Sequence, residues 1–162
     1  MRIPRGEDAS VGGTPAGASE SELWRLVYVS TAKSGITDED LDDILGSARA
    51  RNFFQLDVTG MLMLVGGSFC QILEGSYESV TMVFDLISRD PRHSNVRMLE
   101  LTPISARSFP NWTMGPPSRS VREFAEASDV NEYLGSIRDR AATPAPEVLG
   151  IMREFHAGSL IA

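Results

Sequence analysis

The sequence of 162 residues is poor in the residue types that most often carry metal or covalent chemistry. It has one cysteine, Cys70, and two histidines, His93 and His156. A single cysteine excludes a disulfide within the chain and is typical of a reducing compartment. These three residues lack the spacing of a zinc site, so we predict no metal centre. The sequence also contains no Walker loop, GxGxxG, GxSxG or HExxH motif, so it gives no ground for assigning nucleophilic hydrolysis or nicotinamide chemistry.

Long hydrophobic runs and an excess of positive charge are missing as well. The longest uninterrupted apolar run is Met61–Val65, far short of the ~20 residues of a spanning helix. Arg2 and Arg5 are not followed by the apolar stretch of a secretory signal. Fifteen Lys and Arg against 22 Asp and Glu give a formal charge of −7, which disfavours general binding to nucleic acid or anionic membranes. We predict a cytoplasmic, soluble, acidic protein.

The chain changes character at Leu23. Residues 1–22 have no aromatic residue and are rich in Gly, Ala, Ser, Thr and Pro, a composition that predicts a disordered leader. The whole sequence is 42% hydrophobic and 23% charged, which is ordinary for a globular protein with its own core.

Periodicity after Leu23 predicts alternating strands and helices. Thr37 and Asp40 form a capping-box signal that starts a helix fading around Arg51–Asn52, and Ser76 caps a second helix that must end by Asp90, before Pro91. Strands are predicted at 23–30, 58–65, 68–73 and 95–104, with a Gly-Gly hairpin turn between the second and third. The order βαββαβ predicts an α+β, ferredoxin-like fold with both helices on one sheet face.

The segment after the fourth predicted strand adds further elements. We predict a fifth, edge strand at Ser108–Met114 and two C-terminal helices, at Val121–Arg138 and Glu147–Phe155. Because the first two helices cover one face of the sheet, we expect this C-terminal pair to cover the other.

Two polar side chains interrupt otherwise apolar strands. Gln71 shares a strand face with Phe69 and Leu73, and Tyr28 shares one with Trp24 and Leu26. A buried amide or phenol left without a partner costs roughly 1–3 kcal/mol. One interpretation is that both simply bond to the backbone or to each other inside a core. The other is that they line a ligand site between sheet and helices.

A resemblance to a known family favours the second interpretation. Matching residues occur in order at Arg25–Ser30, Asp40–Leu45, Asn52, Asp57–Leu62, Phe69–Gly75, Asp90–His93 and Pro103–Met114. Together they resemble the blue-light-using-flavin (BLUF) photoreceptor domain over residues 23–115. Residues 1–22 then form the leader, and residues 116–162 form a C-terminal helical cap that carries the output.

The resemblance implies noncovalent FAD with its ring between the two helices. Ile44 and Ile87 match the residues that sandwich the ring; without the family they would be plain core residues. Asn52 matches an amide at the polar edge of the flavin, although Asn also favours a helix C-cap. Asp90 and His93 match positions near the pyrimidine end, or else form a capped turn, and Ser30 matches a further contact.

The resemblance also implies the photochemistry. Tyr28 would donate an electron and a proton, and Gln71, whose amide has a donor and an acceptor end, would rewire its hydrogen bonds by rotation or tautomerisation. Trp112 and Met114 match a strand pair that exchanges inward and outward positions, passing the signal to the C-terminal helices. Their alternative role is a core aromatic and a gap-filling Met.

The sequence therefore predicts a blue-light photoreceptor without an effector enzyme on this chain. It would signal to a separate protein or through its oligomeric state, and the resemblance implies a homo-oligomer. The alternatives are a flavin-free ferredoxin-like interaction module, and a redox enzyme using FAD as hydride carrier, for which the chain has no nicotinamide fingerprint.

Overall fold

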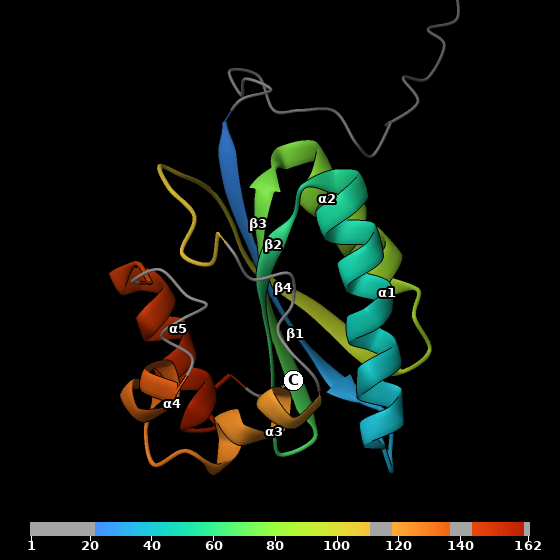
Figure 1. Ribbon diagram of the computed structural model, residues 1–162, viewed down its shortest axis with the longest axis vertical. Helices are drawn as coiled ribbons and strands as arrows, with labels where there is room; N and C mark the ends of the chain where they lie inside the picture. Colours follow the sequence, from blue (N-terminus) through green and yellow to red (C-terminus); the bar gives the residue numbers. More distant parts are fainter. Residues whose placement is uncertain (1–21, 111–117, 137–143, 161–162) are drawn as a thin grey trace, which may run out of the picture.

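The computed structural model describes residues 22–110, 118–136 and 144–160, apart from the side chains of 48–55 and 118–120. Up to Ile104 the elements follow the order βαββαβ, and further helices come after it (Figure 1). Their bounds are β1 Leu23–Ala32, α1 Asp38–Leu56, β2 Thr59–Val65, β3 Ser68–Ser76, α2 Tyr77–Ser88, β4 His93–Ile104, α3 Ser118–Glu126, α4 Val130–Ser136 and α5 Pro146–His156.

The strands form one antiparallel sheet in the order β2-β3-β1-β4. This arrangement confirms the predicted α+β, ferredoxin-like fold. The β2–β3 hairpin turns at Gly66 and Gly67, whose φ angles of 57° and 79° are both left-handed, as the favoured two-residue hairpin turn requires. Of the predicted fifth strand, 108–110 are bends and a turn rather than strand, and 111–114 lie outside the described residues.

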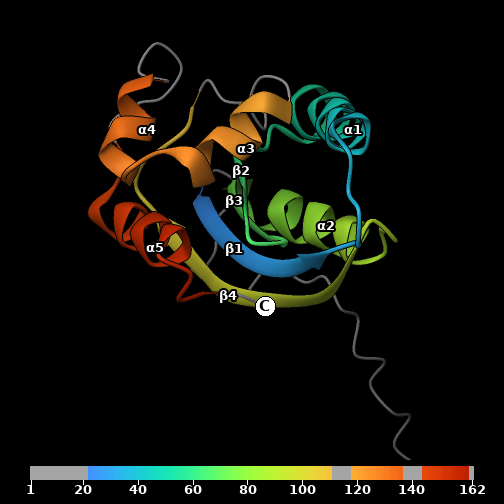
Figure 2. The ribbon, with the colours of Figure 1, turned by 90° about the horizontal axis from the view of Figure 1, so that it is seen from below.

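Two apolar cores lie on opposite faces of the sheet. α1 and α2 cover the face that carries Leu26, Tyr28 and Leu73. α4 and α5 cover the face that carries Val27 and Ile72 (Figures 1 and 2), which confirms that the C-terminal helices pack on the opposite side. Successive residues of a strand point to opposite faces of the sheet. Because both faces are covered by helices, nearly every position of β1 and β3 is buried.

α3 lies beside β2 and belongs to both layers. Its Val121 packs in the core beneath α1 and α2, whereas its Phe124 packs in the core beneath α4 and α5. Figure 2 shows α3 between the two groups of helices at the β2 edge of the sheet. It therefore covers a strand edge that would otherwise be open to pairing.

The predicted starts of α1 and α2 are confirmed at their caps. Thr37 Oγ1 accepts the Asp40 N–H at 3.1 Å, and the Asp40 carboxylate accepts the Thr37 N–H at 2.9 Å. Ser76 Oγ accepts the Ser79 N–H at 3.1 Å. Each side chain binds an amide that the first helical turn leaves without a backbone partner.

The end of α1 was predicted too early. The helix continues through Asn52 to Leu56, so Asn52 lies inside it and is not its C-cap. The residue in the left-handed conformation is Asp57, with φ of 52°, which is the usual geometry just beyond a helix. No helix within the described ranges has the length and apolar character needed to cross a membrane.

The prediction of one helix over 121–138 was wrong, because α3 and α4 are separated by residues 127–129. The Asp129 carboxylate accepts the Glu132 N–H at 2.8 Å, and the Glu132 carboxylate accepts the Ser128 N–H at 2.8 Å. This reciprocal cap begins a new helix at Val130. The described part of the chain after Ile104 therefore holds three helices rather than the predicted two.

Candidate functional site

Tyr28 and Gln71 form a buried pair at the centre of the sheet. They lie opposite each other in the β1–β3 ladder, on the face covered by α1 and α2. The Tyr28 hydroxyl donates to Gln71 Oε1 at 2.5 Å. Only 2% of Tyr28 and 3% of Gln71 are exposed, so this bond lies in a region of low dielectric, where hydrogen bonds are electrostatically strong.

A cavity opens above this pair, between α1 and α2. Ile44 of α1 and Ile87 of α2 lie on its walls, as their positions on the apolar helix faces predict, and Tyr28 and Gln71 lie on the sheet side. The lining residues are Tyr28, Ile44, Ser47, Leu62, Phe69, Gln71, Ile87, Asp90, Arg92 and His93. Apolar walls with a few polar groups are typical of a small-molecule site.

Ser30 and His93 meet at one side of this cavity. His93 Nε2 lies 2.6 Å from the Ile87 carbonyl oxygen, which can only accept, so Nε2 carries a proton. His93 Nδ1 lies 2.8 Å from Ser30 Oγ. In the neutral imidazole Nδ1 accepts the Ser30 proton. The ring is thereby fixed between β1 and the end of α2, with its centroid 6.2 Å from that of Tyr28.

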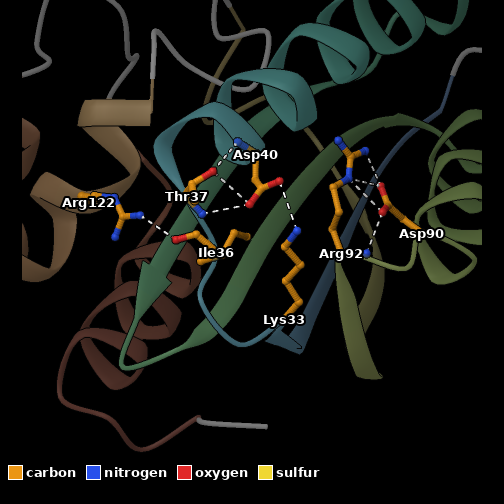
Figure 3. A network of polar contacts seen from close by, with 7 residues as sticks. All are labelled: Lys33, Ile36, Thr37, Asp40, Asp90, Arg92 and Arg122. Carbon is orange, nitrogen blue, oxygen red and sulfur yellow. Dashed lines mark hydrogen bonds and ion pairs between the residues drawn. The ribbon is translucent and has the colours of Figure 1, made fainter.

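Asp90 is held in an ion pair at the turn that follows α2. The Arg92 guanidinium donates to the Asp90 carboxylate through Nε at 2.9 Å and Nη2 at 2.5 Å, and the Arg92 N–H donates at 2.9 Å (Figure 3). These bonds hold the pKa of Asp90 below its ordinary value. Sequence reasoning named Asp90 and His93 but missed Arg92, although it lies between them in the same Asp-Pro-Arg-His turn.

A second polar network ties the start of α1 to its neighbours. Lys33 Nζ donates to Asp40 at 3.2 Å. Arg122 of α3 donates to the Asp38 carboxylate at 2.5 Å and to the Ile36 carbonyl at 3.2 Å. Figure 3 shows the Lys33–Asp40 and Arg122–Ile36 contacts, on either side of the point where α1 begins. The helix that forms one wall of the cavity is thus linked to the first C-terminal helix.

The opposite sheet face holds a buried carboxylate that sequence reasoning also missed. Glu74 accepts the backbone N–H groups of Ser108 and Phe109, both at 2.8 Å. Arg107 donates to the Glu74 carbonyl at 2.8 Å and to Thr59 Oγ1 at 2.9 Å. These bonds fix the backbone that follows β4 to the end of β3.

Cys70 is buried in the core under α4 and α5, on the sheet face opposite to Gln71. Burial raises the pKa of its thiol to about 12, because the apolar surroundings disfavour the thiolate. The described residues contain no cluster of three or more His, Cys, Asp or Glu that would hold a metal ion.

The structure does not describe the side chains of three site residues that the sequence predicts. Trp112 and Met114 lie outside the described residues, and the side chain of Asn52 is likewise not part of the described structure. The structure does bring together Tyr28, Gln71, Ile44, Ile87, Asp90 and His93 around one cavity, with Ser30 bonded to His93.

Comparison with known families assigns the chain to one of them. The family model described as BLUF, sensors of blue-light using FAD, matches residues 23–115. The chain belongs to the BLUF family. BLUF domains are flavin-binding sensors of blue light, and the matched region contains the whole cavity.

Relatives place the BLUF domain in light-regulated proteins. The photoactivated adenylate cyclase subunit beta of Euglena longa is 36% identical over 150 residues, covering 91% of this chain and 17% of that protein. Among solved structures, the dark state of the BLUF protein BlrB has 33% identity and a TM-score of 0.62, covering 86% of this chain and 99% of BlrB. BlrP1 of Klebsiella pneumoniae, solved with FMN and cyclic diGMP, has 26% identity and a TM-score of 0.68 over 83% of this chain and 34% of that one.

Proposed function

We propose that this BLUF protein is a blue-light photoreceptor that binds FAD noncovalently and passes its signal to a separate protein or through its own oligomeric state. One observation carries the proposal. The buried Tyr28–Gln71 hydrogen bond lies at the base of the cavity between Ile44 and Ile87.

The residues around the cavity suit a flavin. Ile44 and Ile87 offer aliphatic surfaces from two helices, between which a planar ring packs without an unpaired polar contact. His93 and Asp90 supply polar atoms to the cavity, and Ser30 bonds to His93. We assign Ser30 to a further contact with the flavin, and Asn52 to the polar edge of the ring by its place on α1. We choose FAD over FMN on the family description, although BlrP1 has been solved with FMN.

A bound flavin would supply blue-light absorption and an electron-accepting ring. Tyr28 is the electron and proton donor in this proposal, because a phenol can release both and a phenylalanine cannot. The Tyr28 hydroxyl oxygen lies 2.5 Å from Gln71 Oε1, to which it donates its proton. Gln71 has an acceptor and a donor end on one planar amide, so rotation or tautomerisation would change its hydrogen bonds without moving the backbone.

We further propose that the output involves Trp112 and Met114 and the C-terminal helices. What supports this is the attachment of residues 107–109, just before that pair, to the end of the strand that carries Gln71. We propose that the receiver of the signal is a separate protein or a second copy of this chain.

The first test is an absorbance spectrum of the purified protein, with flavin supplied during expression, before and after blue light. We expect oxidised-flavin bands that shift reversibly to the red by a small amount. Tyr28→Phe and Gln71→Leu should bind flavin but lose the shift. Tyr77→Phe is the matched control, because Tyr77 contacts Trp24 with ring centroids 5.0 Å apart and does not line the cavity; it should keep the shift.

Several outcomes would overturn the proposal. Purification of a colourless protein would favour a flavin-free interaction module, and a shift that survives in Tyr28→Phe would exclude the assigned donor. Turnover of NADPH with an electron acceptor would support a redox enzyme instead. Chromatography of the released flavin decides between FAD and FMN.

A further inference from the structure

Within the described part of the chain, the exposed large apolar side chains are concentrated on α2 and β4. Among the side chains that the structure describes, the large apolar ones that are exposed are Met82 at 45%, Leu86 at 43%, Met98 at 40% and Leu99 at 37%. All of them come from this one helix and this one strand. A contiguous apolar patch with a polar rim is typical of a protein interface.

A groove runs between these two elements. Its volume is about 590 Å³, and its lining residues are Tyr77, Glu78, Thr81, Met82, Phe84, Asp85, Ser88, Arg89, Met98 and Leu101. α2 forms a ridge along one side of the groove, with Met82 and Leu86 exposed on it. Ridge and groove therefore lie side by side, which allows two copies to insert each ridge into the groove of the other.

The charges on the α2 ridge are also self-complementary. Glu78 lies in the first turn of α2, whereas Arg89 is its C-cap residue. At 100° per residue, both fall on the same helix face as Met82 and Leu86. Arg89 forms an ion pair with Asp85 at 3.1 Å, and both side chains are largely exposed. Such a surface pair is weak and its partners can be exchanged.

We propose that this face binds a second copy of the chain, with the two α2 helices antiparallel about a two-fold axis. Met82 and Leu86 of each copy then enter the α2–β4 groove of the other. The antiparallel orientation brings Glu78 beside Arg89 of the partner subunit, and the two-fold axis repeats this contact at the other end. The same contact is made twice, as an isologous interface requires.

The proposed interface shares side chains with the surroundings of Tyr28. Phe84 lines the groove, and its ring centroid lies 5.7 Å from that of Tyr28. Met98 also lines the groove and lies opposite Tyr28 in the β1–β4 ladder. A change in how Tyr28 packs would reach the interface through these two residues. This coupling between Tyr28 and the interface rests on the proposed photochemistry. If it holds, blue light changes the dissociation constant of the dimer.

Charge reversal tests the interface in the dark, independently of the photochemistry. Sedimentation velocity over a range of protein concentrations should show a monomer–dimer equilibrium for the natural chain. Glu78→Arg and Arg89→Glu should each weaken dimerisation about tenfold, because each change breaks two contacts at once. The double variant Glu78→Arg/Arg89→Glu should restore it, and Met82→Glu should abolish it.

Matched controls make the same changes elsewhere. Glu126→Arg at the end of α3 and Arg153→Glu on α5 alter exposed residues away from the groove and should dimerise as the natural chain does. A natural chain that stays monomeric throughout, or a double variant that dimerises no better than the single ones, would overturn the proposal. If the protein shows the red shift but illumination does not change the dissociation constant of the dimer, the proposed coupling to Tyr28 is wrong and the proposed interface is unaffected.

Discussion

Two polar residues on β3 serve opposite faces of the sheet. Gln71 bonds to Tyr28 in the cavity, and Glu74, three positions later, is buried on the other side and binds the amides of Ser108 and Phe109. Burial raises the pKa of Glu74 above the ordinary value for a glutamate, against the lowering effect of those two amides and of Arg107 and Arg25. A raised pKa means that the folded state disfavours the charged form of the Glu74 carboxylate.

The raised pKa predicts how stability depends on pH at this residue. Because folded Glu74 binds its proton more tightly than unfolded Glu74, its contribution is largest below about pH 4.5 and declines as pH rises through the higher folded value. Glu74→Gln cannot titrate, and it places an NH₂ group against one amide, at a cost of about 1–3 kcal/mol. The free energy of unfolding of the natural chain should therefore exceed that of the variant most at low pH.

Urea unfolding of both proteins at several pH values between 4.5 and 8 measures this difference. Glu126→Gln, at the exposed end of α3, serves as the control and should show no such trend. A gap between natural chain and Glu74→Gln that widens with rising pH would show that the carboxylate is stabilised, rather than penalised, in the fold.

At the scale of elements, side-chain caps decide where helices begin and end. The break between α3 and α4 depends on the Asp129 carboxylate, which accepts the Glu132 amide at 2.8 Å. Asp129→Ala removes this acceptor and should lower the free energy of unfolding by about 0.5–2 kcal/mol. Thermal unfolding followed by circular dichroism measures the loss. Asp129→Asn, which keeps a cap, should retain most of the stability; an equal loss in both variants would assign the effect to charge rather than capping.

The same caps explain what the sequence could predict. Thr37 with Asp40 and Ser76 each stand just before an apolar periodic run, so the starts of α1 and α2 were predictable from local signals. The Gly66-Gly67 hairpin was predictable for the same reason. The α3–α4 break was missed because Val130 and Tyr133 continue a helical apolar spacing through it, and periodicity alone does not reveal a side chain that caps a new helix.

Site residues were predictable where they match a family pattern. They were not predictable where a residue's function depends on contacts with residues far away in the sequence. Tyr28, Gln71, Ile44 and Ile87 lie around one cavity as the resemblance implied. Glu74 looks like one more residue of a buried strand until the chain returns from β4 and presents the Ser108 and Phe109 amides to it. That contact joins residues 34 and 35 positions apart, and no local spacing indicates it.

At the scale of the whole molecule, one sheet separates two cores with different neighbours. The core under α1 and α2 adjoins the cavity, whereas the core under α4 and α5 includes none of the cavity-lining residues. Leu45 of α1 and Met152 of α5 are both fully buried, one in each core. Truncating either to alanine leaves a cavity and should cost about 2–5 kcal/mol. Stability alone would not distinguish the two layers.

Flavin retention should distinguish them. Leu45 is next to Ile44, so Leu45→Ala loosens the helix wall that we assign to the flavin, and Met152→Ala does not touch it. At a temperature where both variants are still folded by circular dichroism, Leu45→Ala should release flavin markedly faster than the natural chain, and Met152→Ala should release it at the natural rate. Fluorescence of the freed flavin measures the rate. Equal release from both folded variants would mean that the cores are mechanically coupled across the sheet, and that the C-terminal layer helps to hold the cofactor.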